Sequence, residues 1–212
     1  MQIHRVIKKG KKDVTIQFDE DKFLILALEV FLKSGLKKGD DISDDRFSTL
    51  IERNKLFYIK QRAFRLLGRR QHSSSELSRK LWNKDYEQKL IDGVIENLKK
   101  NGYLNDKEFI REFVAEKSRT KSWSIKKIKS ELIKRGVASK LIDESLNDRS
   151  KEDDFEKAMK LAKKKYELLL KRNLELKELR NKLSSYLISK GFEYELIKQV
   201  CNNLLKTEID DF

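Results

Sequence analysis

The sequence predicts a mainly α-helical fold, in which three tandem three-helix modules form an elongated helical repeat behind a small N-terminal cap, either α+β or a β-hairpin. The main observation is a set of five apolar columns, spaced 4, 5, 5 and 4 residues apart, that recurs at offsets of 51 and 55 residues. The columns are Leu77, Leu81, Tyr86, Ile91 and Ile95; Ile128, Leu132, Val137, Ile142 and Leu146; and Leu183, Leu187, Phe192, Ile197 and Cys201. A sixth column, Leu90, Leu141 and Leu196, keeps the same offsets. Proline is absent, which suits uninterrupted helices with short connections.

The cap is expected to cover residues 1–53. Polar residues alternate with Val14, Ile16 and Phe18, which is the period of a strand with one buried face. The lysine-rich stretch 8–12, which contains Gly10, predicts a hairpin turn, and a weaker strand is expected before it at residues 3–7.

The rest of the cap is less regular. Residues 23–33 are apolar and suit either a helix or a strand. A short helix is expected to begin at Asp44 or Asp45 and to end at Glu52, after a loop bracketed by Gly35 and Gly39. We interpret the cap as a shield over the open end of the first module.

The first module is expected to cover residues 54–104. Its first helix runs from about residue 55 to 69, its second presents Leu77 and Leu81 on one face, and its third carries a longer apolar stripe. A short break centred on Tyr86 separates the second and third helices. At the start of this break the later modules have Gly136 and Gly191, which suit the left-handed residue that ends many helices.

The second and third modules are expected to cover residues 105–149 and 150–212. Asn105, with Glu108 three residues later, resembles a capping box that opens a helix over residues 106–119. Ser150 is expected to cap a longer first helix in the third module. One face of that helix carries Phe155, Ala158, Met159, Ala162, Tyr166 and Leu169.

Composition limits the class of partner and the location. The net charge is +14, the pI is near 9.6, and 40% of the residues are charged, so the field favours a polyanion or an acidic partner. The alternative is that the lysines form solvated helix faces. No apolar run could act as a signal peptide or membrane span. We therefore expect a cytoplasmic monomer, and we expect the single Cys201 to be a buried apolar residue.

Catalytic patterns are missing from the sequence. His4 and His72 are far apart along the chain, and neither a phosphate-binding loop nor a dinucleotide fingerprint occurs. Acidic pairs such as Asp44-Asp45 stand where carboxylates stabilise the first turn of a helix. We expect no enzyme activity, no metal site and no cofactor.

Three cations recur at the repeat offsets: Lys84, Arg135 and Lys190. Two interpretations remain open. Each cation follows the second helix of its module, where positive charge complements the helix dipole, or the three form a ladder that binds a partner. Trp82 lies in the column of Ile133 and Ile188, and this register favours packing over base stacking.

Four segments carry a resemblance to a known family. The first is Ala63-x-x-Leu66-Leu67-x-Arg69-Arg70-x-x-Ser73-Ser74-x-Glu76-Leu77-x-x-x-Leu81. The second is Leu98-x-x-x-Gly102-Tyr103-Leu104-Asn105-Asp106-x-x-Phe109. The last two are Glu131-Leu132-x-x-x-Gly136-Val137 and Lys190-Gly191-Phe192. Together they resemble the RecX family, which regulates the bacterial RecA recombinase: the second is similar to the link between RecX modules, and the last two match the module ends. The sequence departs from the family at Asn105, where aspartate is usual, and at Ser124, where glycine is common.

The resemblance implies tandem three-helix modules without catalytic activity, which bind the groove of the RecA–DNA filament and limit its ATPase and strand exchange. The implied partners are the RecA filament and single- or double-stranded DNA. Candidate contacts to RecA or DNA are Arg69, Arg70, Arg79, Lys80, Lys84, Lys126, Lys127, Arg135 and Lys190. The competing class is a sequence-tolerant nucleic-acid-binding repeat protein that has no RecA partner.

Overall fold

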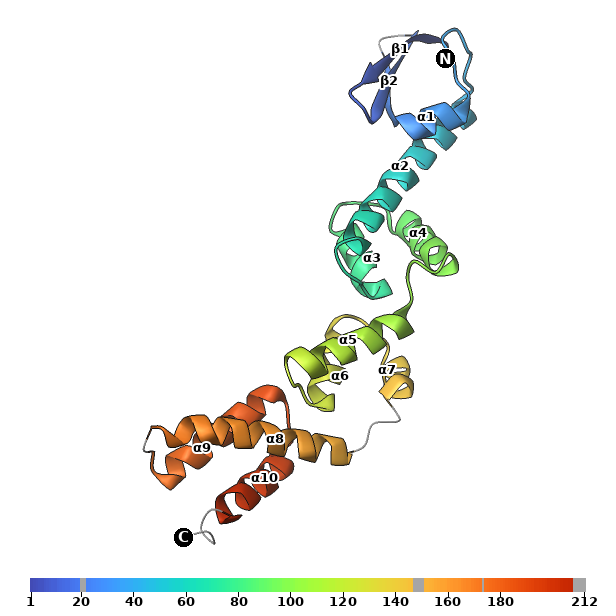
Figure 1. The fold of residues 1–212 in the computed structure, drawn as a ribbon. Coiled ribbons are helices and arrows are strands. Elements are labelled where there is room, and N and C mark those ends of the chain that lie inside the picture. Colours follow the sequence, from blue (N-terminus) through green and yellow to red (C-terminus); the bar gives the residue numbers. More distant parts are fainter. Residues whose placement is uncertain (20–21, 147–150, 173, 208–212) are drawn as a thin grey trace. The chain divides into compact units, whose positions relative to one another are not determined.

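The computed structural model describes residues 1–19, 22–146, 151–172 and 174–207. The chain divides into two compact units, residues 1–104 and 105–212 (Figure 1). The described residues are mainly helical, and their one sheet lies in the first unit. This confirms the predicted fold class.

The N-terminal sheet has three antiparallel strands in the order β1 (Ile3–Lys9), β2 (Asp13–Phe18) and β3 (Phe23–Ala27). The β1–β2 hairpin matches the prediction, and the alternating residues of β2 bury one face. Residues 23–33, which suit either a helix or a strand by sequence, contain one of each: β3 leads directly into α1 (Leu28–Ser34). The α+β alternative for the cap is therefore correct.

The helix predicted to end at Glu52 continues for another four turns. This helix, α2 (Asp44–Leu67), begins where predicted and is capped by Ser43, whose Oγ accepts a hydrogen bond from the amide of Arg46. The prediction of two separate helices is wrong because no glycine or proline interrupts α2 before Gly68. The expected boundary between residues 53 and 54 thus lies inside a continuous helix.

Two side chains of α2 attach the sheet to this helix. The Asn54 amide donates a hydrogen bond to the Ile25 carbonyl and accepts one from the Ala27 amide, both at 2.9 Å. It thereby occupies the edge of β3, where backbone groups would otherwise lack a strand partner. One turn later, Tyr58 donates a hydrogen bond to Asp13 at 2.5 Å. Burial, together with this carboxylate, raises the pKa of Tyr58 to about 12.

The first module is completed by α3 (Ser74–Trp82) and α4 (Gln88–Lys100). Both helices pack on the C-terminal half of α2 (Figure 1), around a core that includes Ile59, Leu77 and Ile91. Between α3 and α4 the chain turns at Asp85, whose φ of 59° is unusual for a residue with a side chain. Gly136 and Gly191 hold the same left-handed position in the later modules, with φ of 75° and 87°.

The second unit contains the other two modules. Its helices are α5 (Asp106–Thr120), α6 (Ile125–Lys134) and α7 (Ser139–Leu146), followed by α8 (Lys151–Leu170), α9 (Leu176–Lys190) and α10 (Tyr194–Thr207). Asn105 caps α5 as predicted, because its Oδ1 accepts hydrogen bonds from the amides of Lys107 and Glu108. The predicted cap at Ser150 lies outside the described residues.

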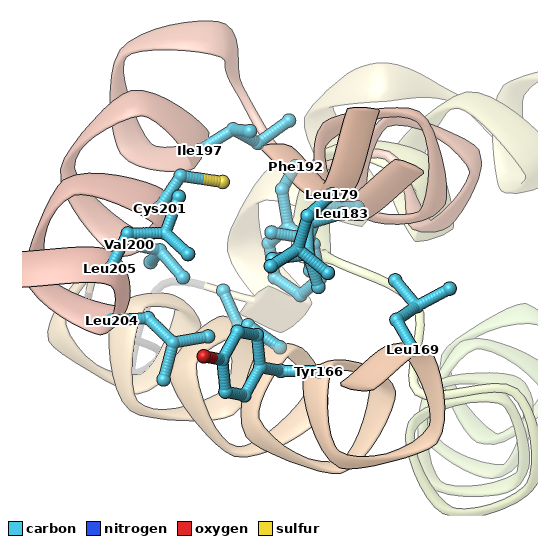
Figure 2. Packing of buried hydrophobic residues seen from close by; sticks show 13 residues of the cluster. Tyr166, Leu169, Leu179, Leu183, Phe192, Ile197, Val200, Cys201, Leu204 and Leu205 are labelled. Atoms are coloured by element: carbon cyan, nitrogen blue, oxygen red, sulfur yellow. The ribbon is translucent and has the colours of Figure 1, made fainter. Parts of the chain in front are cut away.

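The repeat columns form the cores of the modules. Leu77, Ile128 and Leu183 are at most 1% exposed, and the other column residues lie in the same clusters. Figure 2 shows the third core, where side chains of α8, α9 and α10 converge and Cys201 is enclosed among apolar groups. The shared face predicted for α8 is confirmed, since Ala158, Ala162, Tyr166 and Leu169 are buried there.

Candidate functional site

The nine candidate cations lie on or beside the middle helices of the modules. In the first module Arg69 and Arg70 precede α3, Arg79 and Lys80 lie within it, and Lys84 follows it. In the second, Lys126 and Lys127 open α6 and Arg135 caps its end. Lys190 is the last residue of α9. Some of these cations have side-chain partners inside the protein, and others make no such contact among the described residues.

Arg70 belongs to the first group because it binds a buried carboxylate. Glu76 is 4% exposed, and both of its oxygens accept hydrogen bonds from the Arg70 guanidinium, with Nη1 at 3.0 Å from Oε2. Lys80 Nζ lies 3.7 Å from Oε1 of the same carboxylate. Burial alone would raise the pKa of Glu76, but the hydrogen bond from Arg70 and the surrounding positive charges hold it below its usual value.

His72 joins these residues into one polar cluster. Its Nδ1 lies 2.9 Å from the Arg70 carbonyl oxygen, to which it must donate, so Nε2 accepts a hydrogen bond from Lys80 at 3.0 Å. Burial lowers the pKa of His72, and this effect outweighs the hydrogen bond to the Arg70 carbonyl, which raises the pKa. We call Arg70, His72, Glu76 and Lys80 the Glu76 cluster. It fastens the loop before α3 to the helix itself.

Sequence reasoning did not find His72 and Glu76 as members of a site. A signal was available for Glu76, because it is the third residue of a helix capped by Ser73, whose Oγ accepts a hydrogen bond from the Glu76 amide. Its spacing of six residues from Arg70 does not by itself predict the ion pair. That pairing depends on how the loop turns back over α3.

The cations of α6 face the end of α9. The Ser124 amide donates a hydrogen bond to the Lys190 carbonyl at 3.0 Å, and Ser124 Oγ donates to the Gly191 carbonyl at 2.5 Å. Lys127 Nζ donates to the Ser189 carbonyl, and Lys126 pairs with Glu193 at 3.1 Å. The carboxyl end of α9 therefore meets the amino end of α6, an arrangement in which the two helix dipoles attract.

Arg135 and Lys190, two members of the predicted ladder, also contact groups within the second unit. The Arg135 guanidinium lies 4.9 Å from the centroid of the Phe113 ring. Lys190 Nζ donates a hydrogen bond to the Lys121 carbonyl at 3.0 Å and lies 5.3 Å from the centroid of the Tyr186 ring. Lys84, in contrast, is exposed. The three repeat-related cations therefore have different surroundings.

The remaining candidates, Arg69 and Arg79, are exposed like Lys84. All three belong to the first module. Trp82 is also exposed, by 61%, so the prediction that it is a packing residue is wrong. Because a helix turns about 100° per residue, a residue that directly follows the core residue Leu81 points away from the core.

The described residues hold no group of three or more His, Cys, Asp or Glu side chains arranged to bind a metal ion. Among the described helices, none is long and apolar enough to cross a membrane.

Comparison with known proteins finds one family along the chain. Residues 60–98, 105–146 and 152–201 match the first, second and third three-helix domains of RecX. The chain is 31% identical to the regulatory protein RecX of Clostridium beijerinckii over 97% of its length and 95% of the relative's. It is 30% identical to the regulatory protein RecX of Clostridium botulinum strain Eklund 17B, over 97% of its own length and 96% of the relative's.

Two solved structures share the fold. A crystal structure of a regulatory protein RecX aligns with 94% of this chain and 98% of its own, at a TM-score of 0.68 and 20% identity. The RecX of Lactobacillus salivarius aligns with 71% of this chain and 96% of its own, at a TM-score of 0.59 and 24% identity. With three matching domains and relatives alike over nearly the whole length, the chain belongs to the RecX family of regulatory proteins.

Proposed function

We propose that this protein regulates the RecA recombinase without catalysing a reaction of its own. It binds the groove of the RecA–DNA filament and limits ATP hydrolysis and strand exchange. The observation that supports this most is membership of the RecX family along nearly the full chain, with all three helical domains matched.

The charge and the modular construction support the same function. A net charge of +14 attracts a filament that contains DNA, and the exposed Arg69, Arg79 and Lys84 can reach phosphates without breaking internal pairs. Binding through several modules adds avidity, since the later contacts become intramolecular. We infer that the protein acts as a monomer in the cytoplasm; light scattering after size-exclusion chromatography tests the monomeric state.

The test is the DNA-dependent ATPase activity of RecA filaments with this protein titrated in. We expect hydrolysis to fall as the protein is added, to a limit set by saturation of the filament. An unrelated basic protein of similar net charge serves as the control. Unchanged hydrolysis at saturation, or equal inhibition by the control protein, would refute regulation of RecA. An increase would preserve regulation and reverse its sign.

A second candidate function is sequence-tolerant nucleic-acid binding without a RecA partner, which the net charge favours. The two functions differ in one measurable ratio, the affinity for bare single-stranded DNA against the affinity for RecA filaments on the same DNA at the same salt concentration. Regulation of RecA predicts tighter binding to the filament. Equal or weaker binding to the filament supports the second candidate.

A further inference from the structure

Each module has an exposed apolar residue in the last turn of its middle helix, at the same repeat position. Trp82 on α3, Ile133 on α6 and Ile188 on α9 are related by the offsets of 51 and 55 residues. Their exposed fractions are 61%, 52% and 57%. We call these three residues the apolar column.

The helix geometry explains why the column is exposed. Each member directly follows a core leucine, Leu81, Leu132 or Leu187, and all three leucines are 0% exposed. A step of one residue turns the side chain by about 100°, so a middle helix that buries the leucine must present the next residue to solvent. Folding therefore accounts for the position of the column, but it does not require apolar residues there.

One exposed apolar residue is ordinary on a protein surface, but recurrence at one repeat position is not. Among the described middle and last helices, the other large apolar residues that are this exposed are Leu176 and Tyr194. The residues at the same offsets from them are polar: Arg70 and Lys121 for Leu176, and Gln88 and Ser139 for Tyr194. Among the described middle and last helices, the apolar column is therefore the one exposed apolar position that repeats in all three modules.

The side-chain chemistry of the column points to a protein partner. Two of its members are isoleucines, which have no ring to stack on a base and no group to bind a phosphate. An aliphatic side chain gains binding energy by entering an apolar pocket.

Three similar anchors also suit a partner that is built from identical subunits. A polymer of identical protein subunits offers the same pocket many times, so each module can use the same kind of contact, and successive contacts add avidity. A single globular partner would need three separate pockets of one kind. The repeated column therefore favours a protein polymer.

We propose that Trp82, Ile133 and Ile188 are protein-contacting anchors, each of which enters an apolar pocket on a subunit of a protein polymer. This assignment rests on the proposed function and extends it: the apolar column contacts protein, and exposed cations such as Arg69, Arg79 and Lys84 contact DNA.

The experiment replaces the column residues singly and together: Trp82→Ser, Ile133→Ser and Ile188→Ser. Affinity is measured for RecA filaments assembled on single-stranded DNA and, separately, for the same DNA without RecA. We expect each single change to weaken filament binding about tenfold, as for loss of one buried apolar side chain, and the triple change to weaken it by more than about a hundredfold. Binding to bare DNA should stay unchanged.

The matched controls are Leu168→Ser and Tyr194→Ser, which remove side chains that are 60% and 71% exposed but lie outside the column. Both should bind filaments like the wild type. The melting temperature of every variant should match that of the wild type because the replaced side chains are exposed. If the triple variant is less stable, the filament affinities of the single variants test the proposal.

The outcomes separate the two levels of the proposal. A wild-type protein that does not bind filaments refutes the proposed function itself. If the wild type binds and the triple variant binds equally well, the anchor assignment alone is overturned. Equal losses for filament and bare DNA would also overturn it, because the column would then contact nucleic acid.

Discussion

At Glu76 the chain removes a carboxylate from water and surrounds it with positive charge. A buried carboxylate is costly unless it is paired and hydrogen-bonded, and Arg70 supplies hydrogen bonds to both of its oxygens. By sequence, Arg69 and Arg70 are neighbouring candidates for binding. Both are exposed, but only Arg70 is paired with the buried Glu76 among the described residues.

The first prediction tests this separation. Arg70→Gln should lower the free energy of unfolding by about 1–2 kcal/mol, because the buried Glu76 loses its main partner. Arg69→Gln, one residue away, should change it by less than about 0.5 kcal/mol. Urea denaturation of both variants measures the difference. Equal stabilities would mean that the Arg70–Glu76 pair does not hold the loop.

A second prediction concerns His72 and acid. Its pKa is lowered in the folded protein, chiefly by burial, so below the ordinary value of 6.5 the unfolded chain binds a proton that the folded chain does not. The free energy of unfolding therefore falls as the pH drops below about 6.5, until the folded-state pKa is reached.

His72→Gln removes this titration. The free energy of unfolding, measured in urea at pH 7.5 and pH 5.5, should then fall less between the two values than in the wild type. Glu76, whose pKa is lowered from 4.5, contributes to acid sensitivity only below that window. The same loss in both proteins would show that His72 is not the group responsible.

At the scale of helices, the contact between the ends of α9 and α6 joins the second and third modules. Backbone carbonyls at the end of α9 accept hydrogen bonds from Ser124 and Lys127. Gly191 permits this approach, because a Cβ there would overlap Lys127 Cβ and lie 2.9 Å from Ser124 Oγ. Lys126 and Lys127, proposed from the sequence as partner contacts, therefore also have a structural role.

The third prediction compares Gly191→Ala with Gly102→Ala. Both glycines have positive φ, 87° and 75°, but a Cβ at Gly102 would meet nothing within 4 Å. Each change should cost about 1–2 kcal/mol for the left-handed backbone, and Gly191→Ala should cost clearly more because α9 and α6 must move apart. Thermal melts of the two variants test this, and equal losses would mean that the junction tolerates the methyl group.

Across the whole molecule, the candidate cations differ in their freedom to bind. Arg70, Lys80, Lys126, Lys127, Arg135 and Lys190 contact partners inside the protein. The side chains of Arg69, Arg79 and Lys84 are exposed and make no such contact among the described residues. A phosphate can pair with the exposed set at no cost to internal contacts. We therefore expect the first module to contribute more to DNA binding than the predicted ladder implied.

The fourth prediction is that Arg69→Gln, Arg79→Gln and Lys84→Gln together weaken DNA binding. Affinity for single-stranded DNA should fall, and the slope of log affinity against log salt should become shallower by up to about 2, as expected when three phosphate contacts release fewer counterions. Stability should change little. Fluorescence anisotropy across a salt series measures both quantities.

Lys8→Gln, Lys9→Gln and Lys11→Gln together provide the control, since they remove the same charge from exposed positions of the cap hairpin. An equal loss of affinity from both triple variants would mean that net charge, and not the first module's surface, governs binding.

Much of the fold follows from the sequence alone, because apolar periodicity reports which residues leave water. The repeat columns predicted three modules, and residues such as Leu77, Ile128 and Leu183 are buried in equivalent places. Helix starts at Asp44 and Asp106 were also predictable, since local caps at Ser43 and Asn105 produce them. These features depend on neighbours within a few residues or on a pattern that occurs three times.

The tertiary structure decided what depends on distant neighbours and on direction around a helix. The continuity of α2, the pairing of Arg70 with Glu76 and the contact of Lys127 with α9 arise from segments that only folding brings together. The exposure of Trp82 shows the same limit. An apolar residue beside a core leucine looks like core in the sequence, but a turn of about 100° per residue places it in solvent, where a partner can reach it.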